Sequence, residues 1–266
     1  MSAPPAVVPV DVTVDVRVVD VTLRVPRQDP VRAWLVEGSG TGRPRPAVLG
    51  LHWLGHLHND RGEFLPLAVE LASRGVVSLL PAGHFPWVPD PDGTAQDVAR
   101  VRAQVDAHEV ALDHLLAQPS VDPARVAVVG HDYGGMYGAL LAERDDRVTA
   151  LAIQAGDATW GSWFSTYWLG LEGEARTEYA AHFAGLDPVQ HVGRLGERVL
   201  FQWAGKDTFV SEETRAAYAA ANPRARTHLY ENAEHQLGDR AAVDLTAFLV
   251  EQLALDPVAG TTMAQN

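Results

Sequence analysis

Short apolar runs rich in valine, isoleucine and leucine alternate with helical patterns from Pro46 to the end of the chain. This order predicts a mostly parallel sheet with helices on both faces. The beginning differs, because residues 11–25 alternate apolar and polar side chains with period two and residues 31–37 follow after a turn, which indicates an antiparallel start. We therefore predict a single α/β domain (residues 1–266) with an eight-stranded sheet, and flexible ends at about residues 1–10 and 256–266.

The alternation is interrupted at about residues 157–191. Three Trp, two Tyr and two Phe occur there without a strand pattern. We interpret the segment as a short lid inserted between two strands. Its aromatic side chains would otherwise form an exposed apolar patch, and the concave mouth of a site is a surface that they can cover.

Charge and composition exclude several classes of function. The chain has 21 Lys and Arg against 34 Asp and Glu, a net charge of −13, which on average repels nucleic acid and anionic membranes. It has no cysteine, so disulfides, thiolate nucleophiles and Cys-based metal sites are excluded. No apolar run is long enough to span a membrane, and the first residues lack a basic leader. We expect a cytoplasmic protein with a small-molecule substrate; a homodimer is compatible with the sequence.

Residues 126–142 read VAVVGHDYGGMYGALLA and combine a buried strand pattern with the beginning of a helix. His131, Asp132 and Tyr133 fall in the tight turn between them, with glycines at 130, 134 and 135. Small residues flank the nucleophile in such a strand-to-helix elbow, because neighbouring backbone leaves no room for side chains. Asp132 therefore occupies the position of a nucleophile, at the end of a strand and the N-terminus of a helix.

Two further residues complete the order nucleophile, acid, histidine. Asp207 follows an apolar strand in AGKDTFVS, and His235 follows the next strand in NAEHQLG. Open sheets of this kind place their sites at the carboxyl ends of strands. We predict a catalytic triad of Asp132, Asp207 and His235. Asp157 remains a rival for the acid, and His228 is a weaker candidate base because it falls inside a predicted strand.

The chemistry of a carboxylate nucleophile differs from that of serine. A carboxylate is ionised near neutral pH and needs no base to activate it. Its attack on the carbon of an epoxide or a carbon–halogen bond gives an alkyl ester that water can hydrolyse, whereas its attack on an ordinary ester would give a reactive anhydride. In this scheme His235, oriented by Asp207, activates the water, and backbone N–H groups hold the oxyanion. We expect the N–H of Tyr133 and that of Trp53 or Leu54 to be the donors.

The motif GHDYGG resembles the elbow of α/β-hydrolases that use aspartate, such as epoxide hydrolases and haloalkane dehalogenases. The stretches LAVELASRGVVSLLP and ALDHLLAQPSVDPARVAVVG, with the short insert, resemble the dienelactone-hydrolase branch. The resemblance covers about Pro46 to Leu253 and implies an α/β-hydrolase fold. Epoxide hydrolases would show H-G-x-P where this chain has His52, Trp53, Leu54 and Gly55.

The resemblance leaves four functions open: an epoxide hydrolase, a haloalkane dehalogenase, an ester or lactone hydrolase, and a non-catalytic ligand-binding scaffold. Tyr167 or Tyr179 could protonate an epoxide oxygen, while the indoles of Trp53, Trp163 and Trp168 could bind a halide. Dehalogenases would carry Trp directly after the nucleophile, and Tyr133 stands there, which favours the epoxide.

One histidine-rich loop resembles a metal motif. His56, His58 and Asp60 match part of the H-x-H-x-D-H zinc motif of metallo-β-lactamase-like hydrolases, but Arg61 replaces the last histidine. With a ligand missing and a complete triad elsewhere, we expect neither a metal nor another cofactor.

Overall fold

The computed structural model describes residues 15–39, 44–53 and 61–255. Its strands form one eight-stranded sheet in the order β1-β2-β4-β3-β5-β6-β7-β8. In chain order they are β1 (Val16–Leu23), β2 (Val31–Gly38), β3 (Arg45–Leu51), β4 (Val77–Pro81), β5 (Val121–His131), β6 (Ala150–Gln154), β7 (Val199–Ala204) and β8 (Arg226–Tyr230). The predicted flexible ends, about residues 1–10 and 256–266, lie outside the described residues.

The sheet has an antiparallel beginning and a parallel body. β2 runs antiparallel to both β1 and β4, and every later pairing, from β3 with β4 to β7 with β8, is parallel. This confirms the predicted change from hairpin to parallel sheet. The central strand β5 is buried over Val126–His131, because helices cover both faces of a parallel sheet and leave no face for polar side chains.

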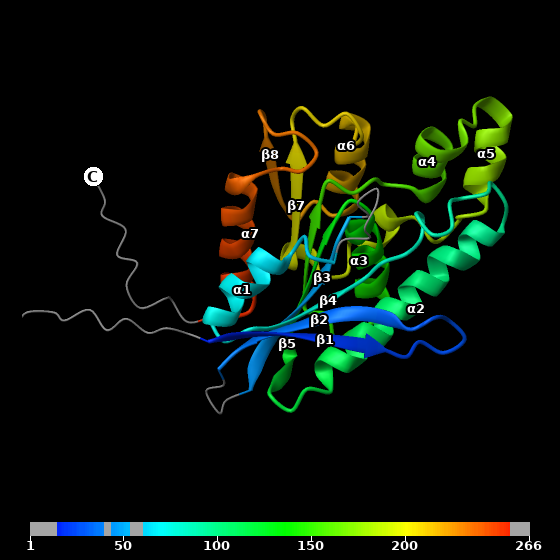
Figure 1. Cartoon of the computed structure of the whole chain (residues 1–266). Coiled ribbons are helices and arrows are strands. Elements are labelled where there is room, and N and C mark those ends of the chain that lie inside the picture. Colours follow the sequence, from blue (N-terminus) through cyan, green and yellow to red (C-terminus); the bar gives the residue numbers. More distant parts are fainter. Residues whose placement is uncertain (1–14, 40–43, 54–60, 256–266) are drawn as a thin grey trace, which may run out of the picture.

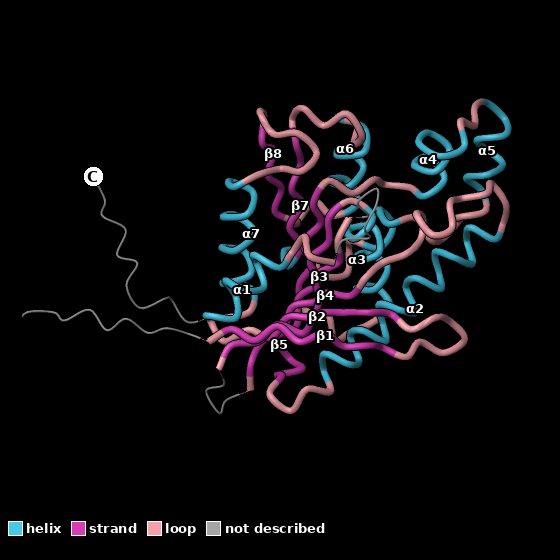
Figure 2. Tube along the Cα trace, in the orientation of Figure 1, coloured by secondary structure: helices cyan, strands magenta, loops and turns pink. Residues whose placement is uncertain are grey.

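Helices cover the two faces of the sheet unequally (Figures 1 and 2). α1 (Leu65–Ser73) and α7 (Asp239–Gln252) pack on one face over a smaller apolar core. α2 (Gln96–Leu116), α3 (Tyr133–Arg144) and α6 (Glu212–Ala221) pack on the other face over a larger core. This arrangement is the α/β-hydrolase fold. Within the part of the chain described, no helix combines the length and the apolar character that crossing a membrane requires.

The segment predicted as a lid, residues 157–191, folds into short helices, and we call it the cap. It contains α4 (Trp160–Phe164), the π-helical turn η1 (Ser165–Leu169), α5 (Gly173–Ala181) and the 3₁₀ turn η2 (Pro188–His191); a further turn, η3 (Gly196–Arg198), leads into β7. Thr159 begins α4 by accepting the Ser162 N–H with its side chain. α4 and α5 stand beside the end of α2 (Figure 1). The cap is thus carried by the face of the sheet that holds the larger core.

Candidate active site

Asp132 lies in a sharp turn between β5 and α3. Its backbone has φ 49° and ψ −116°, a combination that residues with a side chain rarely adopt and that costs about 1–3 kcal/mol. The Asp132 N–H donates to the Gln154 carbonyl at 2.8 Å, and its carbonyl accepts the Met136 N–H at 3.0 Å. These bonds hold the turn between β6 and the first turn of α3. The predicted elbow is present.

Two glycines of the elbow are required by close backbone contacts. A Cβ on Gly134 would lie 1.8 Å from the Leu51 carbonyl oxygen, and one on Gly130 would lie 2.2 Å from the Gly134 backbone. Both distances are far shorter than real contacts, so any side chain would displace β3, β5 or α3. The sequence pattern G-x-D-x-G therefore reflects how tightly the elbow packs against β3.

The carboxyl ends of β7 and β8 bring Asp207 and His235 to the elbow. The Nδ1 atom of His235 lies 3.0 Å from Oδ2 and 3.2 Å from Oδ1 of Asp207. Its Nε2 atom faces Oδ2 of Asp132 at 3.9 Å. At this distance the two groups form a direct ion-pair contact. All three side chains are buried. We call Asp132, Asp207 and His235 the floor of the site.

Burial and charge oppose each other in the floor. Burial would lower the pKa of His235, but hydrogen bonds and charges from Asp132 and Asp207 raise it to about 9. Burial raises the pKa of Asp132, and the neighbouring His235 offsets part of that rise. Burial likewise acts to raise the pKa of Asp207, yet the His235 hydrogen bond and two backbone N–H groups lower it overall. The charged forms of His235 and of the two carboxyl groups therefore stabilise one another against the cost of burial.

The two rival residues lie elsewhere. Asp157 is buried after β6 and accepts the Thr159 N–H at 3.0 Å; burial raises its pKa to about 6. His228 lies in β8, as predicted, and its Nδ1 faces Asp244 at 3.3 Å. The acid hydrogen-bonded to His235 is Asp207, so the geometry favours the triad assignment over both rivals.

A second pair supports the floor, and the sequence analysis missed it. Nδ1 of His131 lies 2.5 Å from Oε1 of Glu63, and Nε2 lies 3.0 Å from the His235 carbonyl oxygen. His131 thus links the Glu63 carboxylate to the backbone of His235. Glu63 carries no periodic or motif signal. His131 stands beside Asp132 in GHDYGG, and this adjacency was its only sequence signal.

Of the three expected oxyanion donors, one lies beside Asp132, one is engaged elsewhere and one lies outside the described residues. The N–H of Trp53 donates to Oε2 of Glu63 at 2.8 Å, so in this structure it is engaged by a carboxylate, which corrects its predicted role as a free donor. The N–H of Tyr133 acts on the Asp132 carboxyl group and favours its ionised form. Leu54 lies outside the described residues. Tyr133 is thus the predicted donor that the structure places beside Asp132.

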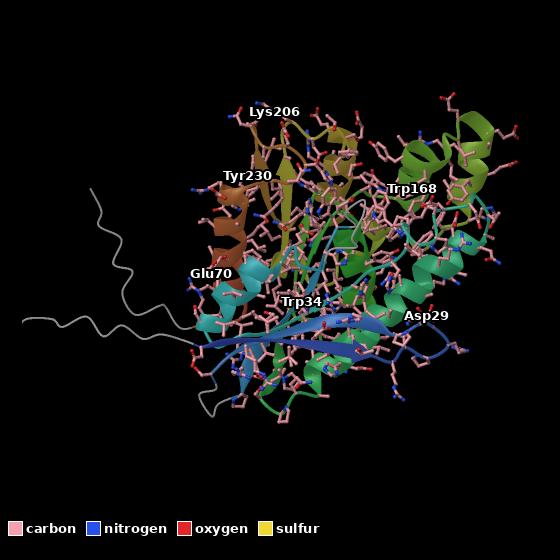
Figure 3. All side chains as sticks on the ribbon, viewed as in Figure 1. Asp29, Trp34, Glu70, Trp168, Lys206 and Tyr230 are labelled. Atoms are coloured by element: carbon pink, nitrogen blue, oxygen red, sulfur yellow. The ribbon has the colours of Figure 1, made fainter. Side chains whose placement is uncertain are left out.

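A cavity of about 260 Å³ opens above the floor. Its lining consists of two floor residues and seven aromatic side chains: Asp132, His235, Trp53, Trp87, Tyr133, Trp163, Tyr167, Trp168 and Phe209. Trp168, which Figure 3 labels, comes from the cap. The rings exclude water around the carboxylate, and the size suits a small molecule.

Five side chains were predicted to contact a leaving group, and the structure separates them. The cavity is lined by Trp53, Trp163, Tyr167 and Trp168. The Tyr167 hydroxyl donates to the Phe209 carbonyl at 2.9 Å, and the Trp168 indole N–H donates to the Tyr133 hydroxyl at 2.9 Å. Both donors are therefore engaged within the protein.

Tyr179 is a correction. Its ring is buried, and its hydroxyl donates to Oδ2 of Asp97 on α2 at 2.7 Å. This hydrogen bond to the Asp97 carboxylate connects the cap to α2. Tyr179 does not line the cavity.

The partial metal motif of His56, His58 and Asp60 lies outside the described residues. Among residues 15–39, 44–53 and 61–255, no three His, Asp or Glu side chains gather closely enough to hold a metal ion.

Solved structures share this fold at low sequence identity. A Klebsiella pneumoniae protein assigned as a dienelactone hydrolase matches with a TM-score of 0.61 and 17% identity, covering 90% of this chain and 99% of that one. An acetyl xylan esterase from Paenibacillus sp. R4 matches with a TM-score of 0.71 and 18% identity over 90% and 89% of the two chains. Oligopeptidase B from Leishmania major matches with a TM-score of 0.69 and 14% identity; 90% of this chain corresponds to 37% of that one.

Sequence comparison gives a family that the resemblance had not named. No curated protein matches the chain. The model of the prolyl oligopeptidase family, peptidase family S9, matches residues 102–254, which is more than half of the chain and includes the elbow and the whole floor. With its eight-stranded sheet and elbow, the chain is a member of the α/β-hydrolase superfamily, and within it the chain belongs to the prolyl oligopeptidase family.

Proposed function

We propose that this chain is a hydrolase in which Asp132 attacks an electrophilic carbon of a small molecule and His235, with Asp207, hydrolyses the resulting alkyl ester. The substrate class is a small epoxide with apolar substituents. One observation carries the proposal: the Asp132 carboxylate sits in a strained elbow, at the cavity, 3.9 Å from a histidine whose other ring nitrogen is held by Asp207. A strained residue at a cavity is typical of a functional position.

In the first step an Asp132 oxygen forms a bond to the epoxide carbon, the ring carbon–oxygen bond breaks, and its electron pair stays on the ring oxygen. The imidazolium of His235 favours the ionised carboxylate that this step needs. Desolvation by the surrounding aromatic rings removes competing water. The product is a neutral ester on Asp132.

The second step follows from the loss of that charge. Because the Asp132 carboxylate is one of the two groups that raise the pKa of His235, forming the ester lowers this pKa again. The proton that His235 loses neutralises the alkoxide formed in the first step. The neutral His235 can then accept a proton from water, which attacks the ester carbonyl. The N–H of Tyr133 is placed to stabilise the tetrahedral oxyanion. Collapse releases the diol and restores the Asp132 carboxylate.

Trapping of the ester tests this function. We would expose the variant His235→Gln to styrene oxide and measure the intact and peptide masses. The expected result is one substrate mass bound per chain on the peptide that contains Asp132, with no turnover. The matched control is His228→Gln, a histidine in β8 away from the cavity, which should turn over normally. No adduct, or an adduct on another residue, would contradict the proposal.

Ester hydrolysis is the second candidate function. It is favoured by the family and by the fold shared with an esterase over 90% of the chain. It predicts hydrolysis of p-nitrophenyl acetate that Asp132→Asn abolishes, together with no adduct from styrene oxide. The two readouts thus separate acyl transfer from attack on an epoxide.

A further inference from the structure

We propose that the phenol of Tyr133, rather than a tyrosine of the cap, donates the proton to the leaving oxygen when Asp132 opens the substrate. The inference rests on the proposed function and assigns one residue of that same site. It concerns the side chain of Tyr133, which is independent of the backbone N–H beside Asp132.

The hydroxyl of Tyr133 is the phenol best placed for this task. Tyr133 is buried and lines the same cavity as Asp132. Its oxygen accepts the indole N–H of Trp168 at 2.9 Å. No acceptor within the described residues takes the hydroxyl proton of Tyr133, so that proton is free for a ligand in the cavity. The two phenols predicted for this role donate instead to Phe209 and to Asp97.

The side of the cavity also fits. In an in-line displacement the leaving atom departs on the side of the carbon opposite the attacking oxygen. The ring of Tyr133 packs against two cap residues, Trp163 at 5.6 Å and Phe164 at 6.4 Å between ring centroids. Its hydroxyl is held by a third, Trp168. The phenol therefore faces the cap, whereas His235 lies directly beside Asp132 and the attacking oxygen.

Charge keeps this phenol protonated until it is needed. Burial, with the nearby Asp132 charge, raises the pKa of Tyr133 well above its usual range, and the indoles of Trp168 and Trp163 offset only part of this. An alkoxide is the stronger base and takes the proton as the ring bond breaks. Ester formation then lowers the pKa of His235, and the proton that His235 releases restores the phenol through water. Protons and charges balance over the cycle, in which one epoxide and one water give one diol.

The test measures the rate of ester formation on Asp132 in the His235→Gln background, with and without Tyr133→Phe. Styrene oxide leaves a basic oxygen that needs a donor, whereas benzyl bromide leaves a weakly basic bromide that needs little help. We expect Tyr133→Phe to slow alkylation by styrene oxide about 10²-fold or more, the scale of general-acid catalysis. Alkylation by benzyl bromide should change only about twofold, which also reports that the variant has folded with its site intact.

Tyr137→Phe is the matched control. Tyr137 lies one turn further along α3, is also buried, and donates its hydroxyl to the Phe85 carbonyl at 3.1 Å, away from the cavity lining. Its loss should leave both alkylation rates unchanged. A Tyr133→Phe rate that is unchanged with styrene oxide, or reduced equally with both probes, would overturn the assignment. Absence of any Asp132 ester with Tyr133 intact would instead overturn the proposed function and the inference with it.

Discussion

The floor and the cap of the site follow different rules. Asp132, Asp207 and His235 each come within five residues after the end of a parallel strand, and the carboxyl ends of such strands meet at the same edge. The aromatic residues of the cap are held by short helices, and packing decides which way each ring turns: Trp168 enters the cavity, while Tyr179 turns to Asp97. At the floor, the sheet topology therefore determines where each residue lies from its order in the sequence. In the cap, the position of each ring depends on packing instead.

The largest expected effect comes from Asp132, the proposed nucleophile. Asp132→Asn keeps the shape of the side chain and a residue type that tolerates positive φ, but it removes the attacking charge. We expect kcat to fall by about 10⁴-fold or more, as for other nucleophiles. Steady-state turnover of styrene oxide measures this, with the exposed Asp146→Asn as control. Activity close to wild type would show that Asp132 is not the nucleophile.

We expect the elbow that carries Asp132 to tolerate added side-chain volume less than other turns of the fold. Gly134→Ala places a methyl group 1.8 Å from the Leu51 carbonyl oxygen, and we expect the free energy of unfolding to fall by about 3 kcal/mol. Gly193→Ala is the control, because its added Cβ would meet only the Ala221 oxygen at 3.6 Å. Urea unfolding compares the two, and equal stability would mean that the elbow can relax.

The charge of His235 predicts how stability depends on pH. Its pKa in the folded protein is about 9, above the ordinary 6.5. The imidazolium therefore stabilises the fold fully below pH 6.5, and this contribution is lost as pH rises through 9. We expect about 2 kcal/mol of the free energy of unfolding to disappear across that window, less than the shift alone implies because Asp132 is coupled to it. In His235→Gln the same pH titration of urea unfolding should be flatter; an equal slope would contradict the ion pair.

Glu63 should matter less, because it acts through its neighbours. Glu63→Gln keeps an acceptor for the Trp53 N–H but removes the charge beside His131. Since His131 holds the backbone of His235, we expect kcat to fall about tenfold through loss of positioning. Glu70→Gln on α1, whose carboxylate pairs with Arg74, is the control. Rates that match this control would show that the floor needs no such support.

The smallest effect is expected in the cap. Tyr179→Phe removes the hydroxyl that binds Asp97, which should lower the free energy of unfolding by about 1 kcal/mol. The rate of Asp132 alkylation by styrene oxide should stay the same, because Tyr179 does not line the cavity. A fall in that rate of about 10²-fold would support the original prediction that Tyr179 donates a proton to the leaving oxygen.

The floor and the cap also differ in how much of their structure could be predicted from the sequence. The change from antiparallel to parallel strands was predictable, because period-two alternation and buried branched runs are local signals. The elbow was also predictable, because such a turn brings backbone so close to positions 130 and 134 that only glycine fits there. Because Asp132, Asp207 and His235 each follow a predicted parallel strand, the sequence also predicted that all three lie at the carboxyl edge of the sheet.

What could not be predicted depends on contacts between distant segments. Nothing near Tyr179 in the sequence indicates that Asp97, on another helix, attracts its hydroxyl. Likewise no motif near Trp53 indicates that the Glu63 carboxylate accepts its N–H, which engages one of the two alternatives for the second oxyanion donor. The environment of the Tyr133 hydroxyl depends on Trp168, which is 35 residues away in the cap, and no local pattern near Tyr133 indicates that contact.

Isotope incorporation tests the central claim, that the Asp132 carboxylate is the nucleophile, most directly. Excess enzyme would turn over styrene oxide once in ¹⁸O-labelled water, and the peptide containing Asp132 would then be weighed after digestion. Because water attacks the ester carbonyl of Asp132 in the proposed second step, one ¹⁸O should enter the Asp132 side chain and the diol should carry an oxygen from the protein. Label found entirely in the diol, with none in Asp132, would show that water attacks the substrate directly and would contradict the account.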